Sequence, residues 1–485
     1  MHGIQLNELQ RFLKNFFFRI LSLLISTVFS ILLISHYSKV LLVDGFGKYN
    51  FLLTYTSYFH LIITLGLDIV AVREISVHRG KAREILGAMI PLRFILAAIA
   101  FIAMMLPIAF SSKLQNYGWL LAVFGCSVFF IPISCQYVFE AFKRLEYPSI
   151  ISVIVPVVTY LLAIMFVKDP GGIFAAGLIN SGSIALLVLM QIVLVIKIHG
   201  KPRLTLDPVI WKRLLKSGII IGFIQITVTM VHYFNIILLE FLKDNTAVGL
   251  FSAAYRAMFM IITLMGIFHN LMNPILFENF KKSAGDFRKY FEKYMKFMIY
   301  FSYGVTIVFI ILAEYYLNIF YDIKQYHDSI LCFRILMLSL LFMTVNSPLH
   351  SGMLAAHREK TLLGIIVFQF SCNVIGNLIL IPRYGIIGSS IATVLTEAIG
   401  LPFYVYYFRK IMPVHLVKDF SIAVLAAVPM GLFLYFVPIH YIFRGIIGTG
   451  IMILFTVLLR GYTIKEILDI KSSLFSINNK KRNRT

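Results

Sequence analysis

Apolar runs of about twenty residues, separated by short charged or Gly/Pro-containing segments, repeat along the whole chain. A helix of that length crosses the hydrocarbon core of a bilayer. Only 14% of the 485 residues are charged, which is about half the share that a water-exposed surface usually carries. The sequence therefore predicts an all-α, polytopic membrane protein. It excludes a disordered chain, a coiled coil, a secreted disulfide scaffold and a cytosolic enzyme.

The runs and the breaks between them predict about fourteen transmembrane helices. The eighth is unusually polar, and the last two are short. The segment GFGKYN at 45–50 is expected to form a turn between two spans rather than a phosphate-binding loop, because no strand precedes it. The expected spans lie near 16–36, 50–70, 86–110, 118–138, 148–167, 173–196, 217–240, 247–276, 294–313, 330–352, 361–381, 387–408, 420–438 and 444–460.

The basic residues predict the orientation of the chain. Lys and Arg number 44, and alternate loops carry them in roughly fourfold excess, which marks those loops as cytoplasmic. Both termini are therefore expected in the cytoplasm. The positive-inside rule also accounts for the net charge of +22, so no nucleic-acid partner is expected. Arg11, Lys14 and Arg19 begin the first span without a small-residue cleavage site, so this span is expected to remain as an anchor.

The sequence lacks the signatures of enzymes. It contains no Walker-type phosphate loop, zinc motif or Gly-x-Ser-x-Gly elbow, and its largest expected outer loop, 314–329, has no catalytic constellation. The four cysteines lie inside apolar runs without the spacing of a metal site or redox pair. We expect a protein that is not an enzyme, with no catalytic residues, no metal and no cofactor.

An internal repeat predicts the domain organisation. Gly47 opens the second span and Gly249 opens the eighth, and each is followed by an Ile-Ile-Thr-Leu run, at 62–65 and 261–264. Such repeats are common in transporters. We predict two parallel six-helix lobes around a central cavity, then two extra helices and a basic cytoplasmic tail. Their expected ranges are 1–200, 201–410, 411–460 and 461–485.

Polar side chains inside the spans are candidates for a functional site, because ionisable groups at membrane depth usually face a cavity or a partner. At about 100° per residue, Ser252, Arg256 and Asn270 fall on one face of the eighth span. We predict that they line a hydrated cavity; the alternative is that small polar groups join helix to helix. The predicted cavity residues are Arg256, Arg93, Arg334, His232, Gln225, Ser252, Asn270, Tyr55 and Tyr58.

Further charged residues predict coupling or gating. Glu397 is the one carboxylate well inside an expected span. Arg93 and Arg334 either extend to the membrane surface or pair with an acid. The residues expected to couple or gate transport are Asp68 and Arg73 at the inner end of the second span, Glu397, and Glu240 at the outer end of the seventh.

Four motifs resemble those of a known family. The stretch 45–76, GFGKYNFLLTYTSYFHLIITLGLDIVAVREIS, resembles the opening of polysaccharide exporters in the multidrug/oligosaccharidyl-lipid/polysaccharide superfamily. AVGLFSAAYR at 247–256 and IPRYGIIGSSIATVLTE at 381–397 resemble that family's later signatures, and QYVFEAFKRLEYPSIIS at 136–152 fits the loop after its fourth span. The chain is most similar to O-antigen repeat-unit flippases of the Wzx type, which also share the extra terminal helix pair.

The resemblance implies a flippase that moves undecaprenyl-pyrophosphate-linked oligosaccharide from the inner to the outer leaflet of the bacterial cytoplasmic (inner) membrane, in lipopolysaccharide biosynthesis. It implies alternating access coupled to an H⁺ or Na⁺ gradient or to the membrane potential. The implied partners are the lipid-linked glycan, membrane lipids and the polysaccharide polymerase machinery. On this resemblance Arg256 is a cavity cation for the anionic substrate, and Asp68 and Arg73 lie at the inner mouth.

Two other classes of function stay open at this point. A cation-coupled drug or metabolite antiporter of the same fold would need carboxylates in the cavity, whereas the clearest charge expected there is Arg256. A polysaccharide polymerase or a lipid-linked-sugar glycosyltransferase would need a substantial outer loop that carries acids or arginines. The sequence therefore favours the flippase.

Overall fold

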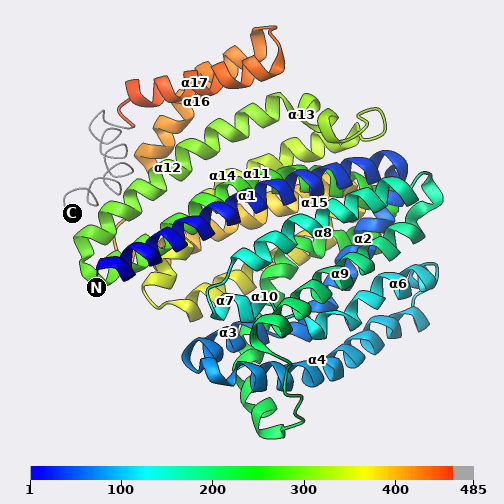
Figure 1. Cartoon of the computed structure of the whole chain (residues 1–485). Coiled ribbons are helices and arrows are strands. Elements are labelled where there is room, and N and C mark those ends of the chain that lie inside the picture. Colours follow the sequence, from blue (N-terminus) through cyan, green and yellow to red (C-terminus); the bar gives the residue numbers. More distant parts are fainter. Residues whose placement is uncertain (1, 415, 462–485) are drawn as a thin grey trace. The chain divides into compact units, whose positions relative to one another are not determined.

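The computed structural model describes residues 2–414 and 416–461, and this part of the chain consists of α-helices, short 3-10 turns and loops without any β-strand (Figure 1). The predicted all-α fold is confirmed. The basic tail predicted at 461–485 lies outside the described residues beyond Gly461. The helices are α1 (His2–Val40), α2 (Leu42–Thr64), α3 (Leu67–Val77), α4 (Ala82–Met105), α5 (Ser112–Gln115), α6 (Gly118–Gly125), α7 (Gln136–Ala141), α8 (Glu146–Phe166), α9 (Ile173–His199), α10 (Pro208–Leu242), α11 (Asn245–Lys282), α12 (Ala284–Ile311), α13 (Ala313–Phe320), α14 (Asp328–Ala355), α15 (Glu359–Phe408), α16 (Val417–Phe436) and α17 (Tyr441–Leu458).

Twelve helical stretches among the described residues are long and apolar enough to cross a membrane. The multi-pass prediction is confirmed, although the count of about fourteen spans is not. The spans expected at 361–381 and 387–408 are two helical segments within the range labelled α15, and they meet at a kink where Gly385 has non-helical φ and ψ angles of 55° and −130°. The span expected at 50–70 falls on α2 and α3 and is not among the twelve, because polar side chains and a break in the helix interrupt its apolar character.

The glycines of the internal repeat lie where two helices touch. GFGKYN is part of α2 and does not form the turn expected from the sequence. A Cβ atom at Gly47 would lie 1.8 Å from the carbonyl oxygen of Asn245, and one at Gly249 would lie 2.2 Å from that of Val43. Each glycine thus lets the opposite backbone approach, so the starts of α2 and α11 cross in direct contact.

The contacts of the described chain form two compact units. The first contains the chain up to Ala253, together with Phe320–Tyr326 and Asn377–Ile386. In this unit α1 packs along α8, α8 packs on α9, and α2 contacts both α4 and α10. A large part of its core surrounds α3 and includes the buried side chains of Leu67, Ala71, Met89, Phe139 and Leu214.

The second unit contains Ala254–Ile319, His327–Gly376 and the chain from Ile387 onward. Here α12 packs on α14 and on α16, and α16 packs on α17. The pair α16 and α17 lies in the range where the extra terminal helices are expected. The lobe boundaries expected near residues 200 and 410 stay a prediction. The contact among α12, α16 and α17 is filled by Ala426, Ala427, Met430, Leu434 and Met452.

Candidate functional site

A break between α2 and α3 positions the strongest candidate site. Leu65 and Gly66 both have positive φ angles, of 38° and 68°, and α3 begins at Leu67. Gly adopts this backbone at no steric cost. Asp68 lies in the first turn of α3, where the helix N-terminus favours a negative charge. Interrupted helices are tolerated in membrane proteins only where protein or a hydrated cavity satisfies the freed backbone.

Helix α10 covers this break. A Cβ atom at Gly66 would lie 2.6 Å from the carbonyl oxygen of Gly218 and 2.7 Å from the amide nitrogen of Gly222. A Cβ atom at Gly222 would in turn lie 2.6 Å from the carbonyl carbon of Leu65. The two backbones therefore touch with no side chain between them, and the position of α10 depends on the shape of the break.

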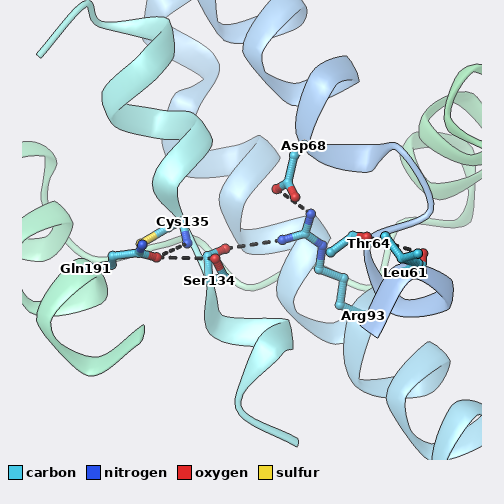
Figure 2. A network of polar contacts seen from close by, with 7 residues as sticks. All are labelled: Leu61, Thr64, Asp68, Arg93, Ser134, Cys135 and Gln191. Atoms are coloured by element: carbon cyan, nitrogen blue, oxygen red, sulfur yellow. Dashed lines mark hydrogen bonds and ion pairs between the residues drawn. The ribbon is translucent and has the colours of Figure 1, made fainter. Parts of the chain in front are cut away.

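Arg93 on α4 binds the carboxylate of Asp68 (Figure 2). Arg93 Nη2 donates to Asp68 Oδ1 over 2.6 Å, and Nη1 donates to the carbonyl oxygen of Ser134 over 3.2 Å. The Arg93 side chain is 0% exposed, whereas that of Asp68 is 41% exposed. Of the two alternatives expected for Arg93, the structure shows pairing with an acid. A buried arginine without such a partner is strongly destabilising.

The network continues across the first unit. Gln191 on α9 accepts from the backbone N–H of Cys135 and from the hydroxyl of Ser134, both over 3.2 Å (Figure 2). The Arg93 guanidinium lies 5.4 Å from the centroid of the Tyr137 ring. Side chains of α3, α4 and α9 thus meet at the non-helical segment before α7. Ser134, Tyr137 and Gln191 are absent from the sequence prediction, although Gln191 is a lone amide in an apolar run.

The far end of α3 is also tied to α10. Arg213 Nη2 of α10 donates to Glu74 Oε2 over 3.0 Å. Helix α10 is also tied to α4, because the indole N–H of Trp211 donates to the carbonyl oxygen of Ala88 over 2.9 Å. The side chain of Arg73, the predicted gate residue, is exposed, and the neighbouring Glu74 makes the ion pair instead. The gating role of Arg73 stays a prediction.

Glu240 lies in a second polar cluster at the C-terminal end of α10. Its carboxylate is 3% exposed and accepts from the Tyr117 hydroxyl over 2.7 Å. Burial, with the hydrogen bond to Glu240 next, raises the pKa of Tyr117, so this hydroxyl stays a donor. Lys113 Nζ donates to the carbonyl oxygens of Glu240 and Lys243 over 2.9 and 2.8 Å. These groups line a pocket of ≈ 320 Å³ together with Lys48, Asn116, Leu120, Asp244 and Asn245.

The remaining predicted residues of the first unit lie on α2, α10 and α11. The Tyr55 hydroxyl donates to the carbonyl oxygen of Met104 over 3.0 Å. The hydroxyls of Tyr58 and Ser252 are buried without a hydrogen-bond partner among the described residues. Gln225 is half-buried. The side chain of His232 lies outside the described ones. Their role in lining a cavity stays a prediction.

In the second unit the predicted residues lie on three helices: Arg256 and Asn270 on α11, Arg334 on α14 and Glu397 on α15. Arg334 Nε donates to the carbonyl oxygen of Ile310 over 3.1 Å. Arg256 on α11 is half-buried. Glu397 on α15 accepts from the side-chain amide of Asn346 on α14 over 3.0 Å. The side chain of Asn270 lies outside the described ones.

The described residues thus form membrane-length helices, with an interruption next to the ion pair of Arg93 and Asp68. The whole fold is similar to that of the lipid II flippase MurJ, with a TM-score of 0.73 at 15% identity over 92% of this chain and 98% of that one. It is also similar to an inward-facing multidrug resistance MATE family transporter of the MOP superfamily, with a TM-score of 0.62 at 14% identity over 79% of this chain and 95% of that one. The chain therefore has the multi-pass helical fold that these two proteins share.

The sequence comparison identifies the family. A model described as "Polysaccharide biosynthesis protein" matches residues 12–280, more than half of the chain, and the chain belongs to this family. The resemblance inferred from the motifs is confirmed. The family and the structural neighbours also support the prediction that the chain is not an enzyme.

Two curated relatives match shorter stretches. The capsular polysaccharide biosynthesis protein CapF of Staphylococcus aureus is 24% identical over 181 residues, which are 36% of this chain and 44% of that protein. An uncharacterized membrane protein of Methanocaldococcus jannaschii is 42% identical over 70 residues, which are 14% of this chain and 17% of that protein. The matched stretches thus span less than half of either relative.

Proposed function

We propose that this chain is a flippase for undecaprenyl-pyrophosphate-linked oligosaccharide, an O-antigen or related repeat unit, and moves it from the cytoplasmic to the outer leaflet of a bacterial inner membrane. Membership of the polysaccharide biosynthesis protein family is the observation that carries the proposal. The fold shared with MurJ is consistent with it.

The physical problem that such a substrate poses agrees with this architecture. A charged, sugar-bearing head group does not cross about 30 Å of hydrocarbon, whereas its polyprenyl tail remains in lipid throughout. The task requires polar groups at membrane depth and no bond chemistry. The network around Arg93 and Asp68 places a carboxylate at the interruption between α2 and α3, and interrupted helices are the feature that transporters use at such sites.

In this proposal the half-buried Arg256 binds the pyrophosphate, because the planar guanidinium fork donates two hydrogen bonds to phosphate oxygens. The other proposed substrate-binding residues are Arg93, Arg334, His232, Gln225, Ser252, Asn270, Tyr55 and Tyr58. Asp68, Arg73, Glu397 and Glu240 gate or couple the movement to an H⁺ or Na⁺ gradient or to the membrane potential. Membrane lipids and the polysaccharide polymerase machinery are the proposed partners, and both termini are proposed to lie in the cytoplasm.

A cation-coupled drug or metabolite antiporter is the second candidate, because the fold is also similar to that of the MATE family transporter. The buried carboxylates of Glu240 and Glu397 are the groups that such an antiporter would use. The two candidates predict different phenotypes in cells.

Deletion of the gene from its native host, with and without complementation, tests the proposal. We expect loss of surface polysaccharide and accumulation of the lipid-linked oligosaccharide on the cytoplasmic leaflet, both reversed by the intact gene. Unchanged surface polysaccharide together with increased sensitivity to cationic drugs would instead establish the antiporter. A C-terminal fusion to a fluorescent protein that matures only in the cytoplasm tests the predicted orientation of the tail.

A further inference from the structure

The carboxylate of Glu397, in the second unit, accepts a hydrogen bond from the side-chain amide of Asn346. It lies on α15, and Asn346 on α14 holds it from one side. Asn346 Nδ2 donates to Glu397 Oε2 over 3.0 Å and to the Glu397 carbonyl oxygen over 3.2 Å. The Asn346 side chain is 2% exposed. The amide is therefore fixed against both the carboxyl group and the backbone of the same residue.

The other end of this amide lacks a donor. Asn346 Oδ1 is buried and has no hydrogen-bond partner among the described residues. Buried acceptors of this kind are uncommon and cost free energy when they are left unpaired. An ionised Glu397 only accepts hydrogen bonds, so it cannot satisfy Oδ1; a protonated carboxyl group carries one O–H that can. A carboxylic acid and a primary amide then pair reciprocally, through one O–H···O and one N–H···O bond.

We propose that Glu397 and Asn346 form a proton-binding site, and that the proton bound there is the ion that drives transport. A proton adds to one carboxylate oxygen of Glu397 and makes the group neutral; its new O–H donates to Asn346 Oδ1, while Asn346 Nδ2 keeps its bond to the other oxygen. Release of the proton restores the carboxylate, and no other bond changes. The role in driving transport rests on the proposed function, whereas proton binding itself does not.

The geometry favours a proton over a metal cation. The Asn346 amide turns its N–H donor toward the Glu397 carboxylate, and a positive N–H edge repels a sodium ion from the same oxygen. Sodium would also need several further oxygen ligands. Among the described residues, no group of three or more His, Cys, Asp or Glu side chains is arranged to hold a metal ion.

Titratable groups on α11, α12, α14 and α15 lie in the same unit as the pair. Tyr404 lies two turns beyond Glu397 on α15, and the His350 ring on α14 lies 4.3 Å from the Tyr404 ring. His350 Nε2 is buried without a partner among the described residues. On α11, His269 Nδ1 lies 2.6 Å from both the Tyr294 hydroxyl of α12 and the Ser347 hydroxyl of α14.

Infrared difference spectroscopy of the purified full-length protein in lipid nanodiscs tests proton binding without any substrate. We expect a carboxylic-acid C=O band that titrates with pH, is lost in Glu397→Gln and shifts in Asn346→Leu. Glu292→Gln, at an exposed ion pair on α12 with Arg288, is the matched control and should leave the band unchanged. A band that persists in Glu397→Gln, or one that responds to sodium at constant pH, would overturn the proposal. If Glu397→Gln fails to fold, Glu397→Asp takes its place. This variant should shift the band, and an unshifted band would overturn the proposal.

A second measurement connects the site to transport. In proteoliposomes that hold undecaprenyl-pyrophosphate-linked oligosaccharide, a pH gradient should bias its distribution between leaflets for the wild type and for Glu292→Gln. Glu397→Gln should give the same equilibrium distribution with and without the gradient. An equal bias in Glu397→Gln overturns the coupling role. No movement by the wild type, with the infrared band intact, contradicts the proposed function alone.

Discussion

The guanidinium of Arg93 and the carboxylate of Asp68 share a hydrogen bond of 2.6 Å although one side chain is 0% exposed and the other 41%. Arg93 is therefore held at depth by a partner that solvent or another ligand can reach. Arg93 also donates to the carbonyl oxygen of Ser134. A substitution at Asp68 would therefore alter the contacts of α4 and of the segment before α7.

Replacement of Asp68 by Asn should destabilise the protein, because it leaves Arg93 buried without a counter-charge. Removal of one partner of a fully buried pair costs about 3–5 kcal/mol; we expect about 1–3 kcal/mol here because Asp68 is partly exposed. Thermal unfolding in detergent measures the loss, with a thiol-reactive dye that reports exposure of the buried Cys135 and Cys332.

The exposed pair of Arg288 and Glu292 supplies the control for that experiment. Glu292→Gln should change the stability by less than about 1 kcal/mol. Equal melting temperatures for Asp68→Asn and Glu292→Gln would mean that the Arg93–Asp68 contact does not hold α3 and α4 together.

The contact between the α2–α3 break and α10 should not tolerate a methyl group. Gly66→Ala must adopt a φ of +68° and would place its Cβ 2.6 Å from the Gly218 carbonyl oxygen. We expect a loss of about 2 kcal/mol or more. Gly182→Ala on α9, where no atom lies within 4 Å of the new Cβ, should be neutral or stabilising by up to about 1 kcal/mol. Similar melting curves for the two variants would show that α10 does not pack on the break as described.

The cluster at the C-terminal end of α10 should open when Lys113 is replaced. Lys113→Met removes the donor of the bonds to the Glu240 and Lys243 carbonyl oxygens, each worth about 1.5–3 kcal/mol when one partner is charged. A cysteine placed at Asn116, in a Cys126→Ala background, should then react several-fold faster with a membrane-impermeant maleimide.

Lys48→Met is the matched control for this change. Lys48 lines the same pocket, but it pairs with Asp44 within its own helix. Labelling should therefore stay at the wild-type rate. Faster labelling in Lys48→Met, or none in Lys113→Met, would argue that Lys113 does not fasten the end of α10.

Arg256 tests the proposed substrate contact. Arg256→Ala should reduce surface polysaccharide about tenfold or more at equal protein level, because a pyrophosphate would lose its bidentate donor. Arg256→Lys keeps the charge but not the planar fork and should restore part of the export. Full export by Arg256→Ala would remove Arg256 from the proposed site.

The fold class could be predicted from the sequence because the apolar runs have the length of a membrane span. The two segments of α15 that meet at Gly385 were also expected as separate spans, whereas the break of the polar second span at Leu65 and Gly66 was not, because no break in its apolar pattern marks that position. The repeat glycines Gly47 and Gly249 were recognised, whereas their contact with each other's helices required the structure.

The partners in the ion pairs could not be predicted from the sequence either. An arginine within an expected span at position 93 is visible in the sequence, but its partner lies 25 residues away and is brought near by the break before α3. Arg73 and Glu74 are about 100° apart around a helix, so a shift of one residue decides which of them reaches Arg213. Asn346 and Gln191 are single amides whose partners depend on how whole helices pack.

The most direct test of the central claim is translocation by the purified protein. Proteoliposomes would carry undecaprenyl-pyrophosphate-linked oligosaccharide made on one leaflet only, and a membrane-impermeant glycosidase would report the glycan that reaches the other. The account predicts rapid transfer by the wild-type chain and transfer reduced to the protein-free rate by Arg256→Ala. Wild-type vesicles that transfer no faster than protein-free vesicles would contradict it.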